Sequence, residues 1–178
     1  DELVVAHTNE TEYRAFIANK KNEALHSRMI VMRIPYNLRV SQEERIYRKL
    51  IDASNLQGVH IAPNALWTAA VFSVLSRLRE PKKPGIDLVK KMYLYDGAEV
   101  DGVKQADVEE LRREHPDEGM SGVDPRYVIN RISSALIKGG KACINALDVL
   151  KSLKDGLDQH PSITKEERER LLNLITVA

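Results

Sequence analysis

Two short apolar runs, separated by a helical stretch, stand at the start of this 178-residue chain, and no strong strand signal follows them. The runs are 3–6 (LVVA) and 29–34 (MIVMRI), with a helix predicted between them over 10–26. Continuous apolar runs of this length are typical of strands covered on both faces of a parallel sheet. The first 35 residues therefore predict the end of an α/β sheet, and the remainder is expected to be helical.

Apolar residues recur at helical spacing from residue 41 onward. The sequence from Ser41 to Glu44 predicts a capping box at a helix start. Pro125, preceded by Asp124, predicts another helix start, and that helix ends before Gly139. The other helices are expected over 63–78, 86–95, 105–114, 142–157 and 164–177. The predicted fold class is mainly α, with a short β-α-β segment followed by a helical bundle.

The charge balance and the hydropathy exclude several classes of protein. The chain has 27 basic and 26 acidic residues, so its net charge of +1 gives no broad basic field for nucleic acid or anionic membranes. No apolar run approaches the roughly 20 residues that a membrane span needs. The single cysteine, Cys143, excludes an internal disulfide and is expected to be buried among apolar neighbours. We expect a cytoplasmic protein that does not bind membranes, and its charge balance disfavours nucleic acid as a partner.

Motifs that could form a complete active site are absent from the sequence. There is no G-x-x-x-x-G-K-[ST] loop to hold phosphates, and no apolar strand ends in paired acids that could hold magnesium. The H-R-D and D-F-G signatures of protein kinases and the H-E-x-x-H and C-x-x-C zinc patterns are also missing. We therefore predict no catalytic residue and no metal ligand in the chain, and expect it to be inactive alone.

Three residues remain as candidates for contact with a phosphate. Asn9 follows the first predicted strand, where an amide could position water near a phosphate, but with Glu12 it also fits a helix N-cap. Arg28 ends the next predicted helix, either complementing the helix dipole or acting as an arginine finger toward a neighbouring subunit. Arg126 begins a helix, where it could bind phosphate oxygens or be a solvated side chain.

In their order along the chain these residues resemble the AAA+ ATPase core. Residues 4–9 (VVAHTN) are similar to its sensor-1 strand, 24–28 (ALHSR) to its arginine-finger segment, and 122–127 (GVDPRY) to its sensor-2 motif. The resemblance is closest to the PrkA family of bacterial serine protein kinases and covers nearly the whole chain. It is carried by residues 19–25, 29–40, 91–97 and 120–135.

The resemblance implies a division into three parts. Residues 1–40 would complete an AAA+ core, 41–138 would form a helical lid, and 139–178 would begin the connection to a C-terminal domain. It also implies that Asn9, Arg28 and Arg126 contribute to a site for ATP and Mg in the intact protein, which would phosphorylate serine in a protein substrate. Because the phosphate-binding loop lies outside these residues, no nucleotide is expected to bind this part alone.

The chain starts directly in a predicted strand without a methionine, so we expect it to be part of a longer protein. The strands at 3–6 and 29–34 would lack the strand that separates them in an AAA+ sheet, so we expect self-association or repacking there. Two alternatives remain open. One is a helical interaction module that binds protein or DNA through its basic faces. The other is an AAA+ ATPase that remodels proteins rather than phosphorylating them.

Overall fold

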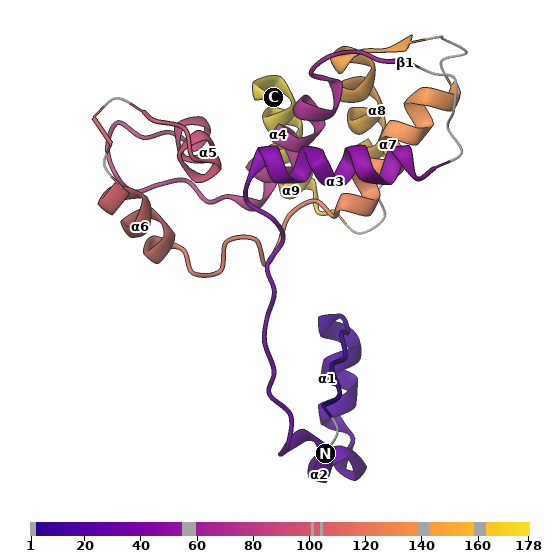
Figure 1. Ribbon diagram of the computed structural model, residues 1–178, viewed down its shortest axis with the longest axis vertical. Helices are drawn as coiled ribbons and strands as arrows, with labels where there is room; N and C mark the ends of the chain where they lie inside the picture. The colour runs from indigo at the N-terminus through magenta and orange to yellow at the C-terminus, as the bar shows by residue number, and fades with distance from the viewer. Residues whose placement is uncertain (1–2, 55–59, 101, 104, 139–142, 159–162) are drawn as a thin grey trace. The chain divides into compact units, whose positions relative to one another are not determined.

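The computed structural model describes all residues except 1–2, 55–59, 101, 104, 139–142 and 159–162 (Figure 1). The contacts divide the chain into two units, Asp1–Ile34 and Pro35–Ala178. Among the described residues there are nine α-helices, a short 3-10 helix and one pair of two-residue strands. The prediction of a mainly α fold is therefore confirmed.

The first unit contains short helices, namely α1 (Glu10–Ala18), η1 (Lys20–Asn22) and α2 (Glu23–His26). Asn9 caps α1, because its Oδ1 accepts a hydrogen bond from the backbone N–H of Glu12 at 2.8 Å. The single helix predicted over 10–26 is interrupted at Asn19, whose backbone is extended (φ −84°, ψ 109°). The Asn19 side chain accepts from the N–H of Lys21 at 3.1 Å and so starts the next turn.

The segments 3–6 and 29–34 do not form the predicted strands. A strand is defined by hydrogen bonds to a neighbouring strand, and neither segment has such a partner among the described residues. Their apolar side chains are exposed instead, with Leu3 at 91% and Ile30 at 92%. The β-α-β part of the prediction is therefore wrong for this chain.

The second unit is a helical bundle built around α4 (Figure 1). Its helices are α3 (Val40–Asp52), α4 (Ala65–Arg77), α5 (Leu88–Asp96), α6 (Gln105–Glu114), α7 (Pro125–Lys138), α8 (Ala146–Asp158) and α9 (Lys165–Val177). Every residue of α4 except Trp67 is buried, as expected of a helix that is apolar on all sides. Helices α3, α7, α8 and α9 all contact it, so α4 forms the centre of the core.

A pair of short parallel strands joins two distant parts of this unit and was not predicted. Strand β1 (His60–Ile61) pairs with β2 (Cys143–Ile144). Successive side chains of a strand point to opposite faces, so Ile144 enters the core while Cys143 is exposed. The expectation that Cys143 is buried is therefore wrong.

Two predicted helix starts have different outcomes. Asp124 caps α7 as predicted, because its Oδ1 accepts from the backbone N–H of Arg126 at 2.6 Å. The capping box is wrong, because α3 already begins at Val40 and Ser41 lies inside its first turn. The N–H and the hydroxyl of Ser41 both donate to Oδ1 of Asp96, at 2.9 and 2.8 Å, and so tie the start of α3 to the end of α5.

Candidate functional site

The site is built around residues 122–126, which we call the α7 turn because they lead into α7. Gly122 has a φ of +118°, a conformation that favours glycine. A Cβ atom at this position would lie only 2.7 Å from Cγ of Arg77 and 3.0 Å from the carbonyl oxygen of Ser76. The α7 turn therefore packs directly on the end of α4 with no room for a side chain.

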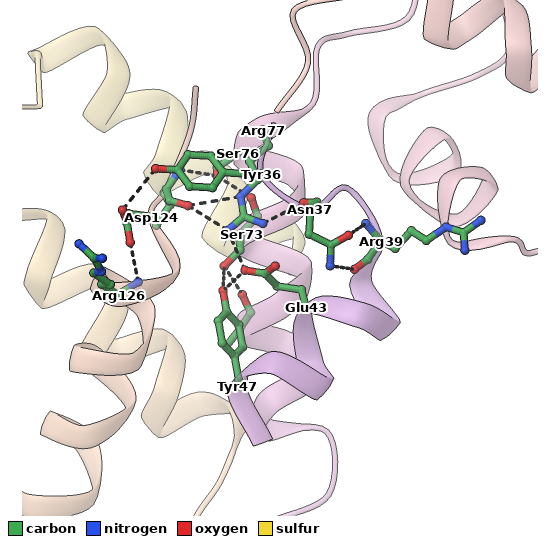
Figure 2. Close-up of polar contacts among 12 residues, drawn as sticks. Tyr36, Asn37, Arg39, Glu43, Tyr47, Ser73, Ser76, Arg77, Asp124 and Arg126 are labelled. Carbon is green, nitrogen blue, oxygen red and sulfur yellow. Dashed lines mark hydrogen bonds and ion pairs between the residues drawn. The ribbon is translucent and has the colours of Figure 1, made fainter. Parts of the chain in front are cut away.

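Arg77, the last residue of α4, holds the α7 turn through its guanidinium group (Figure 2). Its Nε and Nη2 both donate to the carbonyl oxygen of Val123, at 3.3 and 3.0 Å. The N–H of Val123 donates to Oγ of Ser76 at 2.9 Å, so both backbone polar groups of this buried residue are satisfied. Nη1 of Arg77 donates to the carbonyl oxygen of Asn37 at 2.8 Å. One side chain thus fixes the α7 turn relative to the segment before α3.

The negative partner of Arg77 is Glu43 of α3. Nη2 of Arg77 lies 2.7 Å from Oε1 of Glu43, and the two side chains are 0% and 1% exposed. The hydroxyl of Tyr47 donates to the same oxygen at 2.7 Å and lies 2.6 Å from the hydroxyl of Ser73. Oε2 of Glu43 has no hydrogen-bond partner among the described residues. The Glu43 carboxylate therefore depends mainly on Arg77 for compensation of its charge.

Tyr36 connects this buried network to the first turn of α7. Its ring lies 5.0 Å from the Arg77 guanidinium, and its hydroxyl donates to Oδ2 of Asp124 at 3.2 Å. Burial, and then the adjacent Asp124 carboxylate, raise the pKa of Tyr36. Since the other Asp124 oxygen accepts from the Arg126 N–H, both oxygens are engaged. The backbone at Arg126 is thereby fixed, while its side chain is exposed.

The three predicted site residues are all exposed. The structure confirms the helix cap at Asn9, which was the alternative to its predicted role beside a phosphate. Arg28 follows α2, and its N–H donates to the carbonyl oxygen of Leu25 at 3.0 Å. Asn9 and Arg28 belong to the first unit and Arg126 to the second. The convergence of all three on one phosphate stays a prediction.

Sequence reasoning missed the residues that position Arg126. Arg77 lies at the end of an otherwise apolar helix, and this position indicates that its buried charge needs a polar or acidic partner. Glu43 and Tyr47 are four residues apart on one helix, which was a signal that they interact. Neither signal identifies the partner across the chain, because the Glu43–Arg77 contact depends on how α3 packs against α4.

A pocket of about 280 Å³ lies beside the α7 turn, between the start of α7, the end of α8 and the start of α9. Its lining includes apolar side chains and the acidic residues Asp124 and Glu167. Burial raises the pKa of Tyr127, which also lines the pocket, to about 12. Because its charged lining side chains are acidic, this pocket is poorly suited to phosphate.

The described residues offer no feature typical of a metal site or a membrane span. None of their His, Cys, Asp and Glu side chains form a group of three or more that could hold a metal ion. None of the described helices is long and apolar enough to cross a membrane. Arg126, in a fixed backbone with an exposed guanidinium, is the strongest candidate contact in the second unit.

Comparison with known protein families divides the chain near the start of α5. Residues 1–85 match the PrkA AAA domain, which makes this chain part of an AAA-domain protein. Residues 89–178 match the PrkA serine protein kinase C-terminal domain. The chain belongs to the PrkA family. The domain limits predicted from the sequence, 1–40, 41–138 and 139–178, stay predictions.

Two curated relatives support this assignment. The chain is 66% identical over 178 residues to the "ATP-dependent protease PrkA" of Bacillus subtilis, covering all of this chain and 28% of that protein. It is 39% identical over 134 residues to the "Serine/threonine kinase YeaG" of Escherichia coli K12, covering 74% of this chain and 20% of that protein. The chain thus spans less than a third of either relative. The comparison with solved structures found no significant match.

Proposed function

We propose that this chain supplies phosphate-contacting residues to the ATP site of a larger PrkA-family enzyme, and that Arg126 is the main contact from the second unit. The observation that supports this role is the arrangement of the α7 turn. The side chains of Arg77 and Asp124 hold the backbone, yet the Arg126 side chain forms no hydrogen bond or ion pair with the described residues. A fixed backbone with a free guanidinium at a helix start suits a phosphate oxygen.

The first unit would supply the other two contacts. Arg28 would act as an arginine finger on the nucleotide of a neighbouring subunit, where a guanidinium neutralises charge on the transferred phosphoryl group. Asn9 would orient the attacking water, in addition to capping α1. The parent protein would bind ATP with Mg through a phosphate-binding loop outside these 178 residues. The isolated chain would then neither bind nucleotide nor turn it over.

The overall activity that we propose is ATP-dependent phosphorylation of serine in a protein substrate. The name of the family's C-terminal domain and the name of the E. coli relative support it. The name of the Bacillus relative supports a second candidate, an ATP-dependent protease. The two can be separated in the intact protein, because phosphotransfer labels an intact substrate from radioactive ATP whereas proteolysis yields shorter peptides.

The role of Arg126 can be tested in the intact parent protein. We expect Arg126→Ala to lower ATP turnover by tenfold or more, because a charge-assisted contact to the phosphate is lost. Thermal stability should stay unchanged, since the side chain is exposed. Arg113→Ala, which removes an exposed arginine of α6, is the matched control and should keep normal turnover. Normal ATP affinity and turnover in Arg126→Ala would overturn the proposal.

A mixing experiment tests the proposed finger. If Arg28 acts on the neighbouring subunit, a subunit carrying Arg28→Ala still has a complete nucleotide site with its own Arg126. A neighbouring subunit that carries Arg126→Ala still has Arg28, and this arginine can reach the nucleotide site of the Arg28→Ala subunit. Each variant alone should turn over ATP slowly, and mixing the two should restore part of the turnover. Absence of any recovery in mixed assemblies would argue against a finger that acts between subunits.

The helical interaction module remains the alternative function. In that case, the isolated chain would bind a protein or DNA partner without nucleotide. Contact with DNA would weaken steeply as the salt concentration rises, because bound counterions are released on association. Binding of this kind that is lost when basic residues such as Arg131 are replaced would favour this alternative over the ATP-site role.

A further inference from the structure

A second pocket, of about 220 Å³, lies on a different part of the second unit. Its walls come from the residues before α3, the end of α5, and α6 with the segment that follows it. The polar side chains in its lining are Arg39, Tyr95, Arg112, His115 and Glu118. Figure 2 shows the Arg39 side chain pointing away from Asp124 and Arg126, so this pocket is separate from the α7 turn.

The two arginines of this pocket are held in place without carboxylate partners. Nε of Arg39 donates to the carbonyl oxygen of Tyr95 at 3.2 Å, which leaves its terminal nitrogens for other contacts. The Arg112 guanidinium lies 5.4 Å from the centre of the Tyr95 ring. Among the described residues, no acidic side chain forms an ion pair with either arginine. Two oriented guanidinium groups therefore face a space with no counter-charge of their own.

The one acidic side chain in the lining, Glu118, is already neutralised. Its Oε1 accepts from Nζ of Lys91 at 2.5 Å and from the N–H of Arg79 at 2.7 Å, and its Oε2 accepts from the Tyr95 hydroxyl at 2.9 Å. The Lys91 and Glu118 side chains are 0% and 4% exposed, so this ion pair is buried and its charges compensate each other within the protein. The net charge that the pocket presents is positive and comes from Arg39 and Arg112.

We propose that this pocket binds a dianionic phosphate group, either free inorganic phosphate or the phosphate of a monoester. The planar guanidinium group binds phosphate oxygens through paired N–H donors. Two guanidinium groups together come close to balancing the charge of the phosphate dianion. His115 completes the lining, with Nε2 bound to the carbonyl oxygen of Glu80 at 3.1 Å. The volume is below the 300–1,000 Å³ typical of pockets for whole organic ligands. The pocket therefore takes the phosphate group itself and leaves the attached molecule outside.

The test is an NMR titration of the chain with inorganic phosphate, and separately with O-phosphoserine, against sodium chloride at equal ionic strength. We expect saturable shifts at Arg39, Tyr95, Arg112 and His115. Affinity should fall about tenfold or more in Arg39→Met and in Arg112→Met, as expected for the loss of a charged hydrogen-bond donor. Arg113→Met, a neighbouring exposed arginine on the same helix, should bind normally.

The two ligands distinguish the source of the phosphate. Tighter binding of O-phosphoserine would indicate a phosphorylated side chain, and tighter binding of inorganic phosphate a free ion. Either result supports the proposal, provided that both arginine variants weaken it. Three results would overturn it: no saturable shift, shifts confined to the surroundings of Arg126, or binding that is unchanged in both Arg39→Met and Arg112→Met. A spectrum of each variant without ligand shows whether it is folded.

Discussion

Nη2 of Arg77 and Oε1 of Glu43 lie 2.7 Å apart, and the two side chains are sealed from solvent. The pair joins the end of α4 to the first turns of α3, and the same guanidinium binds the carbonyl oxygen of Val123 in the α7 turn. A buried pair is costly to break, because removing one partner leaves the other charged and uncompensated. We therefore expect this contact to control both the stability of the second unit and the position of Arg126.

The first prediction concerns replacement of Arg77. Arg77→Met should lower the free energy of unfolding by about 3–5 kcal/mol, because Glu43 would be left buried without its partner. The double variant Arg77→Met with Glu43→Leu should regain much of this loss, since no buried charge remains. Urea denaturation of the chain measures both. The exposed pair of Arg113 and Glu109 is the control, and Arg113→Met should cost at most about 1 kcal/mol. Equal losses in the buried and exposed pairs would contradict this interpretation.

The helices could be predicted from the sequence more closely than any other feature. Helix α6 spans the predicted range 105–114, and α9 follows Thr164, where its prediction begins. These helices have local signals, because apolar spacing and capping residues lie within a few positions of one another. The strands β1 and β2 have no such signal, since each is two residues long and depends on a partner far along the chain. The sequence therefore predicts the helices but not how they are joined.

The candidate site could be predicted only in part, for a related reason. The Asp124 cap and the helix start at Pro125 are local features, and both are confirmed. The contacts of Arg77 with Glu43, Asn37 and Val123 depend on how three separate segments pack. The segments 3–6 and 29–34 do not form the expected strands, because an apolar segment becomes a strand only where another strand supplies hydrogen bonds.

The second prediction concerns pH and the buried Tyr47. Burial, and then the Glu43 carboxylate, raise the pKa of Tyr47 far above its ordinary value of 10.0. The folded state therefore disfavours the phenolate, so the contribution of Tyr47 to stability is complete below pH 10 and is lost as the pH rises further. Above that pH, the free energy of unfolding should fall by up to about 1.4 kcal/mol more per pH unit than in Tyr47→Phe.

Denaturation of both proteins between pH 8 and pH 11 measures this difference. Tyr36, Tyr95 and Tyr127 also have raised pKa values, but they are present in both proteins and cancel in the comparison. Tyr47→Phe should itself be about 1 kcal/mol less stable near pH 7, because the hydrogen bond to Glu43 is lost. Parallel pH curves for the two proteins would show that Tyr47 does not titrate differently on folding.

The third prediction concerns Gly156, at which α8 packs against α7. A Cβ atom here would lie 2.4 Å from Cδ of Arg131 and 2.6 Å from the hydroxyl of Tyr127. The Tyr127 hydroxyl donates to the carbonyl oxygen of Leu153 at 2.8 Å, which limits its freedom to move away. Gly156→Ala would gain about 1 kcal/mol of helix propensity but lose more through overpacking.

We expect Gly156→Ala to show a net loss of about 1 kcal/mol in the free energy of unfolding. Thermal and urea denaturation measure it. Lys154→Ala, at an exposed position of the same helix, is the control and should change stability by only a few tenths of a kcal/mol. A stability gain in Gly156→Ala would mean that α7 and α8 are not packed as closely as these distances require.

The last prediction concerns the apolar segments of the first unit, through which we propose that the chain self-associates. Val4 is 82% exposed, and Ile30 and Ile34 are 92% and 84% exposed. Their backbones have no strand partner among the described residues, so they can pair with the same segments of a second copy. Burial of these side chains between copies would supply the driving force for association.

Sedimentation velocity of the chain over a range of concentrations measures this association. We expect the average mass to rise with concentration, and Val4→Lys with Ile30→Lys to keep the chain monomeric, because two lysines would be buried at the contact. Ile137→Lys removes an isoleucine of α7 that is 71% exposed in the second unit, and it should associate normally. A chain that stays monomeric at every concentration would rule out this contact. Association that Ile137→Lys abolishes instead would place the contact on the second unit.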